Sequence, residues 1–132
     1  MENTEAPKNG LKVLCAEDEH FISELYGRAL SRAGYTVTNI IDGEQALAAA
    51  LTNEYDIVLL DIMLPNKTGL QILDEVRNDQ TTIRAKIIIA TNLEQSEDNR
   101  KAVEEKADGY IVKAEMTPRQ LVEYLNQFNL QQ

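Results

Sequence analysis

The run from Tyr55 to Pro65, with the sequence YDIVLLDIMLP, constrains the fold of this chain more than any other stretch. Its Ile-Val-Leu-Leu segment shows no polar alternation, which is typical of a strand buried on both faces of a parallel sheet. The strand reaches a carboxylate at Asp61, and Pro65 cannot continue a ladder of hydrogen bonds. Open α/β sheets bind ligands at the carboxyl ends of their strands, so Asp61 is the leading candidate for chemistry.

Strand and helix patterns alternate along the rest of the chain. Strands are predicted at residues 11–16, 35–41, 57–61, 86–91 and 110–112. A helix follows each strand, the first with an apolar face of Ile22, Leu25, Tyr26, Ala29, Leu30 and Ala33 and a stop at Gly34. The later helices begin at Asp42, Thr68, Ser96 and Thr117, three of them with a glutamine three residues on. The alternation predicts a doubly wound five-stranded parallel sheet with five helices and right-handed crossovers.

The chain has 132 residues, of which 43% are apolar, which suffices for one domain with a full core. We expect residues 11–129 to form that domain, with residues 1–10 as a mobile tail and residues 130–132 as a C-terminal tail. Because the sequence stops just after the last helix, we expect no effector domain. No apolar stretch is long enough to span a bilayer and the start is polar, so we expect no membrane insertion.

The net charge limits the class of binding partner, and the single cysteine and single histidine limit the chemistry of the chain. The formal net charge of -9 disfavours direct binding to nucleic acid, whereas divalent cations and basic protein surfaces fit it. The single cysteine, Cys15, excludes an internal disulfide and lies in an apolar strand, which indicates a buried, inert thiol in a reducing cytoplasm. The single histidine, His20, is either an exposed bystander at a helix start or a residue that tunes a nearby site.

Polar residues follow four of the predicted strands. Glu17 and Asp18 come after the first strand, Asp61 ends the third, Thr91 the fourth, and Lys113 follows the fifth. These strand ends share one edge of the sheet, so we expect the side chains to converge there. Each residue also has a structural alternative, because carboxylates cap turns and helix starts, threonine is common in strands, and a lysine can be a solvated loop residue.

Electrostatics narrows what such a cluster can do. Two like charges about 4 Å apart repel by roughly 4 kcal/mol at an effective dielectric constant near 20. Three carboxylates beside one lysine therefore need either a further cation or raised pKa values. A ligand set of oxygens alone suits a hard ion, above all Mg²⁺. An aspartate beside Mg²⁺, a lysine and a hydroxyl has the groups that a phosphoryl acceptor needs.

The ordered set resembles the receiver domain of two-component response regulators over nearly all of residues 11–128. The motifs that carry the resemblance are the acidic pair after the first strand, Thr91, Tyr110-Ile-Val-Lys113, and the spacing of Asp61, Pro65 and Gly69. The resemblance implies a flavodoxin-like, CheY-like sheet with strand order 2-1-3-4-5. It also implies a cytoplasmic signalling protein that takes a phosphoryl group from a histidine kinase or a phosphotransfer protein.

Carried over position by position, the resemblance assigns roles around Asp61, which would be the phosphoacceptor. Asp18 would bind Mg²⁺ directly and Glu17 through water, with the backbone carbonyl of Met63 as a further ligand. Lys113 would pair with the phosphoryl oxygens. Such a protein is no conventional enzyme, since it catalyses its own phosphorylation and its slow dephosphorylation.

The resemblance also implies a switch. Thr91 would swing to bond the phosphate and let Tyr110 turn inward. This movement would couple the added charge to a surface made by the helix from Ser96, the strand 110–112 and the last helix. A downstream protein partner would bind there.

Four departures from the family pattern matter. The acidic pair is Glu-Asp, whose longer arm alters the metal geometry. Ala114 replaces the usual proline after the lysine, so the bond before it is either trans or strained. Asn92 replaces a small residue and narrows access to the site. Met63 and Leu93 are apolar where family members tune the phosphate lifetime, and we predict that they hinder attacking water and lengthen it.

Two other functions compete with the receiver interpretation. An interaction module that works without phosphorylation is favoured by Ala114 and Asn92 and opposed by the complete acceptor set. An aspartate-nucleophile phosphohydrolase would need Asp-x-Asp at the nucleophile, where this chain has Met63. A flavin- or nucleotide-binding sheet fits less well, because no glycine-rich phosphate loop follows the first strand.

Overall fold

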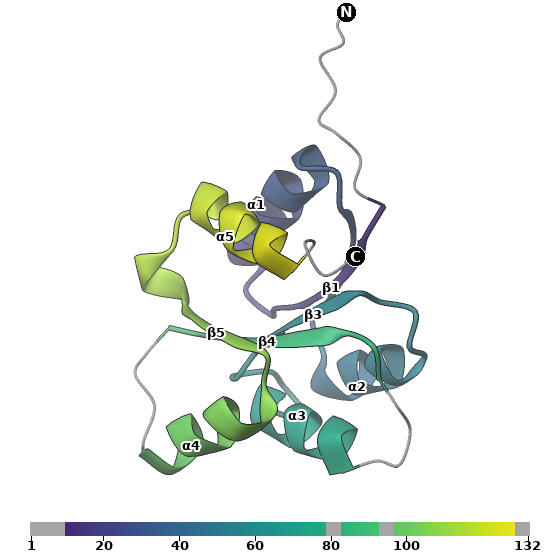
Figure 1. The fold of residues 1–132 in the computed structure, drawn as a ribbon, viewed down its shortest axis with the longest axis vertical. Helices are drawn as coiled ribbons and strands as arrows, with labels where there is room; N and C mark the ends of the chain where they lie inside the picture. The colour runs from purple at the N-terminus through teal and green to yellow at the C-terminus, as the bar shows by residue number, and fades with distance from the viewer. Residues whose placement is uncertain (1–9, 79–82, 93–96, 129–132) are drawn as a thin grey trace, which may run out of the picture.

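The structure, a computed structural model, describes residues 10–78, 83–92 and 97–128. Its five parallel strands are β1 (Lys12–Ala16), β2 (Thr36–Ile40), β3 (Ile57–Asp61), β4 (Lys86–Thr91) and β5 (Gly109–Val112). They form one sheet in the order β2-β1-β3-β4-β5 (Figure 1). This arrangement confirms the doubly wound sheet and the strand order that the sequence led us to expect. The predictions for residues 1–9, Leu93, Ser96 and residues 129–132 lie outside the described residues.

Helices cover both faces of the sheet. Helices α1 (His20–Arg32) and α5 (Pro118–Asn126) lie together on one face. Helices α2 (Gly43–Leu51), α3 (Gly69–Asn78) and α4 (Glu97–Lys106) lie on the other (Figure 1). A single 3₁₀ turn at Lys113–Glu115 joins β5 to α5. The core is accordingly split into two apolar clusters, one on each face of the sheet.

Strand β3 lies at the centre of the sheet, between β1 and β4. All five of its residues are buried, and successive side chains enter opposite core clusters, with Val58 and Leu60 on the α2–α3 side and Ile57 and Leu59 on the α1–α5 side. This double burial explains the continuous apolar run in the sequence. It also fixes the position of Asp61, the last residue of the strand.

The helix ends form as their sequences predict. The Asp42 side chain accepts a hydrogen bond from the Gln45 amide (2.9 Å) at the start of α2. Thr117 and Gln120 make a reciprocal capping box with Pro118 at the first position of α5. Gly34, just beyond α1, has φ 104°, a backbone conformation that favours glycine.

The expected buried face of α1 is confirmed in part, because Tyr26 and Leu30 are buried and Ile22 and Ala33 pack against the same core cluster, but it is wrong at Leu25. The helix buries Ser23, Tyr26, Gly27 and Leu30, whereas Leu25 is exposed. Ser23 and Gly27 are small and occupy this face, where a Cβ atom on Gly27 would lie 3.3 Å from the Asn39 side chain of β2. The helix therefore turns its small residues toward the sheet and leaves Leu25 at the surface.

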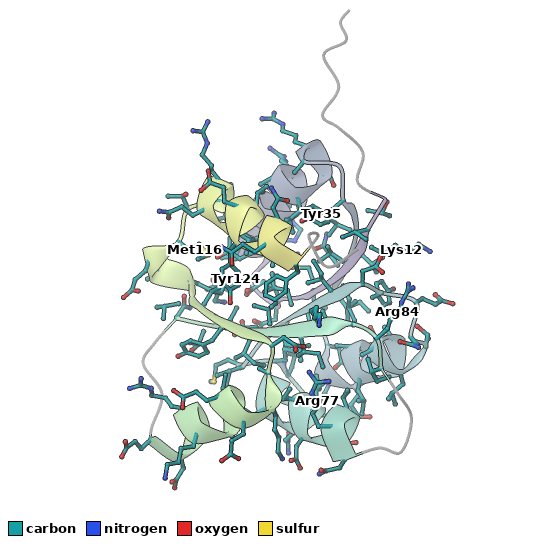
Figure 2. All side chains as sticks on the ribbon, in the orientation of Figure 1. Lys12, Tyr35, Arg77, Arg84, Met116 and Tyr124 are labelled. Carbon is teal, nitrogen blue, oxygen red and sulfur yellow. The ribbon has the colours of Figure 1, made fainter. Side chains whose placement is uncertain are left out.

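Helix α4 is held weakly along its length and firmly at its C-terminal end. Val103 is its only buried residue. At its end, Arg77 of α3 donates to the Lys106 carbonyl (2.7 Å) and to the Asp108 carboxylate (2.9 Å) (Figure 2). An element with few buried contacts shifts at low cost, so α4 is the part of this face best able to move.

Cys15 and His20 lie in the surroundings that the sequence predicts. Cys15 is fully buried, and burial, assisted by the charge of Glu17, raises the pKa of its thiol to about 12. His20 is exposed at the start of α1, 3.6 Å from the Glu24 carboxylate. Within the described residues, none of the helices is long and apolar enough to cross a membrane.

Candidate functional site

The candidate residues lie at the carboxyl edge of the sheet. The register pairs Ala16 with Leu60, Asp61 with Ala90, and Thr91 with Val112. Each polar residue therefore ends its strand or follows it directly at the same level. The convergence that the sequence predicts is present for Glu17, Asp61 and Lys113.

Lys113 links the two buried carboxylates. Its Nζ atom donates to Glu17 Oε1 (2.7 Å) and to Asp61 Oδ2 (3.0 Å). The three side chains are at most 6% exposed, so little water screens their charges. The 3₁₀ turn that begins at Lys113 directs this side chain into the pocket rather than along the strand.

Backbone donors orient the remaining carboxylate oxygens. The Met63 amide donates to Asp61 Oδ1 (3.1 Å), and the Glu19 amide donates to Glu17 Oε2 (3.1 Å). Each carboxylate thus has one partner on each oxygen, which fixes its rotation. A nucleophile held in one orientation needs no further ordering before it reacts.

Asp18 completes an acidic cluster that fits a hard cation. One carboxylate oxygen each from Glu17, Asp18 and Asp61 lie within 4.8 Å of one another, and Asp18 is open to solvent. With Lys113, the ionised groups carry a net charge of -3 + 1 = -2. Carboxylate oxygens around a solvent-facing space suit Mg²⁺, which keeps several of its waters.

The pKa values of Glu17 and Lys113 are both raised in this pocket. Burial raises the pKa of the Glu17 carboxyl, and the neighbouring charge of Asp61 adds to the effect, while the bond from Lys113 opposes it. For Lys113, burial favours the neutral amine, but the hydrogen bonds to Glu17 and Asp61 outweigh it and raise the pKa. The lysine is therefore charged at neutral pH, and the pocket shows both a compensating cation and a raised carboxyl pKa.

Thr91 ends β4 at this edge of the sheet, and Tyr110 lies on β5, where it pairs with Ile89. Thr91 is buried at the end of β4. Tyr110 is half-buried on β5, and its side chain packs against the core cluster on the α2–α3 side of the sheet. The Tyr110 amide donates to the Tyr124 hydroxyl of α5 (3.1 Å; Tyr124 is labelled in Figure 2). Sequence reasoning missed Tyr124, because a tyrosine on an amphipathic helix looks like an ordinary core residue.

The structure shows the conformation or exposure of three residues that depart from the family pattern, Ala114, Asn92 and Met63. All peptide bonds between described residues are trans, which includes the bond before Ala114. Asn92 is exposed beyond Thr91, and Met63 is 72% exposed beside Asp61. The structure fixes the Met63 amide against Asp61, while its carbonyl as a metal ligand stays a prediction.

A five-stranded sheet in this order, with a lysine bridging buried carboxylates at its carboxyl edge, defines the receiver class of signalling domains. The chain belongs to the response regulator receiver domain family, whose family model matches residues 13–126. Receiver domains of this family are phosphorylated on aspartate and bind Mg²⁺ at an acidic pocket. The acidic cluster at Asp61 corresponds to such a pocket.

Curated relatives agree with the family. The response regulator ArlR of Staphylococcus saprophyticus is 40% identical over 102 residues, which cover 77% of this chain and 45% of ArlR. The transcriptional regulatory protein DltR of Streptococcus agalactiae is 39% identical over 103 residues, which cover 78% of this chain and 45% of DltR. The chain therefore spans less than half the length of these relatives.

Solved structures agree as well. The receiver domain of the Francisella response regulator 1452 has a TM-score of 0.82 at 26% identity, with 92% of this chain and 98% of that chain covered. The chemotaxis response regulator CheY4 of Vibrio cholerae has a TM-score of 0.79 at 28% identity, covering 90% and 98%. Both are similar to this chain over almost the whole of their own length.

Proposed function

We propose that this chain is a signalling receiver that accepts a phosphoryl group on Asp61 from a histidine kinase or a phosphotransfer protein. The observation that carries the proposal is the ammonium of Lys113, shared between Asp61 and Glu17 at the carboxyl edge of the sheet. It sets a positive charge beside a buried nucleophile. A merely structural ion pair would need no third carboxylate and no opening to solvent on the Asp18 side.

The proposed reaction is a phosphoryl transfer between two proteins. An Asp61 oxygen attacks the phosphorus of a phosphohistidine, a new O–P bond forms, the N–P bond breaks, and the imidazole leaves with the electron pair. Water later attacks the acyl phosphate, which releases inorganic phosphate and restores the carboxylate. Lys113 exchanges its carboxylate partners for phosphoryl oxygens and offsets the charge that they carry.

The residues present fit Mg²⁺, and Asp18 with Asp61 and the Met63 carbonyl are the proposed direct ligands, with Glu17 acting through water. When bound, the ion supplies positive charge to phosphoryl oxygens. The chain's own contribution is orientation. Lys113 and the backbone amides already hold Glu17 and Asp61 in fixed rotations.

The proposed output runs through α4, β5 and α5. Thr91 would bond the phosphoryl group, and Tyr110 would turn inward behind it. Helix α4 is suited to respond, because Val103 is its single buried side chain. A cavity of about 300 Å³ lies between α4 and β5, and Tyr110 lines it together with Val103 and Ala107.

An apolar rim supports a protein as the phosphodonor. Among the described residues, the most exposed large hydrophobic side chains are Phe21 (72%), Met63 (72%) and Ile41 (59%). Met63 and Ile41 follow the ends of β3 and β2, and Phe21 lies in the first turn of α1 after β1, so all three lie toward the edge of the sheet that holds the acidic pocket. Apolar side chains gathered around one site indicate a surface that a protein partner covers.

The downstream partner is proposed to be a protein. The relatives DltR and ArlR are named as regulators, and DltR as a transcriptional one, but this chain spans only 45% of each. A net charge of -9 argues against direct contact with nucleic acid by the receiver itself. The free, buried thiol of Cys15 is compatible with the cytoplasm, which is the location we propose.

Intact-mass measurement tests the proposal. The chain is incubated with Mg²⁺ and a small phosphodonor such as acetyl phosphate, beside an Asp61→Ala variant. We expect the parent to gain the mass of one phosphoryl group and the variant to gain none. If neither gains mass although Mg²⁺ binding is verified, the interaction module that works without phosphorylation becomes the better account, which Ala114 and Asn92 already favour.

Met63 is expected to lengthen the phosphate lifetime. Its apolar side chain stands beside Asp61 and cannot orient a water, whereas asparagine in its place can hydrogen-bond one. Met63→Asn should therefore lose its phosphoryl group faster than the parent, while Met63→Leu, which stays apolar, should match the parent. The decay of the phosphorylated mass after removal of the donor measures this, and a Met63→Asn variant that outlasts the parent contradicts it.

A further inference from the structure

The loop that follows Asp61 is tied to a helix that carries none of the proposed site residues. The Gly43 amide at the start of α2 donates to the Pro65 carbonyl (2.9 Å). The Asn66 side-chain amide donates to Asp42 Oδ1. Both contacts join residues that are more than twenty positions apart in the sequence, so they fix the loop in space and not just its local shape.

The contact between loop and helix is close enough to require particular residues. A Cβ atom on Gly43 would lie 1.8 Å from the Lys67 carbonyl oxygen, so only glycine allows this approach. Asn66 has φ 70°, in the left-handed region that asparagine tolerates better than most residues. The positive φ turns the chain so that the Asn66 side chain faces Asp42.

The Asp42 carboxylate binds both the start of α2 and the loop. Asp42 Oδ2 accepts from the Gln45 amide and so caps α2, while Oδ1 accepts from Asn66. The hydrogen bond from Asn66, followed by that from Gln45, lowers the pKa of Asp42, which is therefore ionised at neutral pH. The start of α2 and the loop consequently move as one body.

The loop has further contacts at its two ends and at Lys67, whose amide donates to the Pro65 carbonyl (2.8 Å) and whose ammonium pairs with the Glu75 carboxylate of α3. The Ile62 amide donates to Ala90 (3.1 Å), and the Gly69 amide donates back to Ile62 (3.0 Å). Between these points the side chain of Leu64 is buried, and the Met63 amide donates to Asp61 Oδ1 (3.1 Å). The Asp42–Asn66 and Gly43–Pro65 contacts are the ones that join the middle of the loop to α2.

We propose that Asp42 and Asn66 are positioning residues for the cation site, acting through the loop on Met63 and on Asp61. This inference rests on the proposed function, since it concerns how the same site holds Mg²⁺. Groups that orient metal ligands typically change affinity by about 10–100-fold when they are removed. Here the side chains act one step further from the ion, so we expect a smaller change.

Two variants remove the side-chain bond and keep the local backbone. Asn66→Gly retains the left-handed φ, and Asp42→Ser retains a cap for α2. We expect each to raise the Mg²⁺ dissociation constant by about 3–10-fold, a range scaled down from that for residues that contact a ligand directly. Titration with Mg²⁺ alone, followed by the amide NMR signal of Met63, measures the constant without any phosphorylation.

Asn53→Gly is the matched control. Asn53 also has positive φ (60°), and its side chain also makes one hydrogen bond to a distant segment, accepting from the Arg84 amide (2.9 Å). It precedes β3 and so lies at the opposite edge of the sheet (Arg84 is labelled in Figure 2). We expect its Mg²⁺ dissociation constant to stay within twofold of the parent.

The outcomes separate this inference from the proposed function. Weaker Mg²⁺ binding in Asn66→Gly and Asp42→Ser, with Asn53→Gly unchanged, supports the positioning role. Mg²⁺ binding as tight as in the parent in both loop variants overturns the positioning role and leaves the receiver function intact. An equal weakening of Mg²⁺ binding in Asn53→Gly also overturns the positioning role and leaves the receiver function intact. A parent chain that binds no Mg²⁺ overturns the metal site itself. Urea unfolding shows which variants fold, and Asp42→Ser carries the test if Asn66→Gly does not.

Discussion

Lys113→Ala is expected to lower the rate of phosphoryl acceptance by roughly 10²-fold, the usual cost of losing one preorganised donor to developing charge. The lysine is the positive group closest to Asp61, and its loss leaves Glu17, Asp18 and Asp61 facing one another. The fold should also weaken in a chelator, by about 3 kcal/mol, because a buried charge pair loses one partner. Added Mg²⁺ should restore part of that stability, since it binds only the folded pocket.

Lys106→Ala is the control for this prediction. Lys106 also pairs with a carboxylate, that of Asp74, but both side chains are partly exposed. We expect little change in stability and no change in phosphoryl acceptance, because exposed ion pairs contribute little. Intact mass against time and urea unfolding with and without Mg²⁺ measure both variants. Acceptance by Lys113→Ala within threefold of the parent would contradict the role given to the lysine.

Gly69→Ala is expected to damage both the fold and the site. A Cβ atom on Gly69 would lie 2.4 Å from the Asp61 carbonyl oxygen and 3.1 Å from Ile62 Cα, and neither backbone atom can rotate away. The start of α3 must then move off β3, at an expected cost of about 2 kcal/mol or more. A displacement of Asp61 by about 1 Å should lower phosphoryl acceptance by roughly 10²-fold.

Gly27→Ala is the matched glycine substitution. Its Cβ atom would meet only the end of the flexible Asn39 side chain, at 3.3 Å, in the middle of α1. Alanine is the better helix former by about 1 kcal/mol, so stability should hold or rise and phosphoryl acceptance should be unchanged. Thermal unfolding and intact mass compare the two variants. A Gly69→Ala chain as stable and as active as Gly27→Ala would show that the contact with Asp61 is not needed.

The fold was largely predictable because its signals are local. The buried run at β3, the alternation of strands and helices, and the caps at Asp42, Thr68 and Thr117 each depend on a few neighbouring residues. The exposure of Leu25 on α1 was not predictable in this way. It depends on how α1 packs against β2, which is a contact between distant segments.

The site was predictable to the level of which residues meet. Shared strand ends bring Glu17, Asp61 and Lys113 together, and the parallel topology implies as much. The partners of these groups were not predictable, because they depend on side-chain reach and loop path. The bond from Asn66 to Asp42 and that from Tyr110 to the Tyr124 hydroxyl both cross between elements without any motif to announce them.

Phosphorylation of Asp61 should require a divalent cation in the acidic pocket, so the dependence of the phosphorylation rate on Mg²⁺ is the most direct test of the proposed function. The unmodified chain is mixed with acetyl phosphate over a range of Mg²⁺ concentrations, and the phosphorylated fraction is followed by intact mass. We expect a rate close to zero in chelator that rises and saturates as Mg²⁺ fills the site. A rate that is the same in chelator as in excess Mg²⁺ would contradict it.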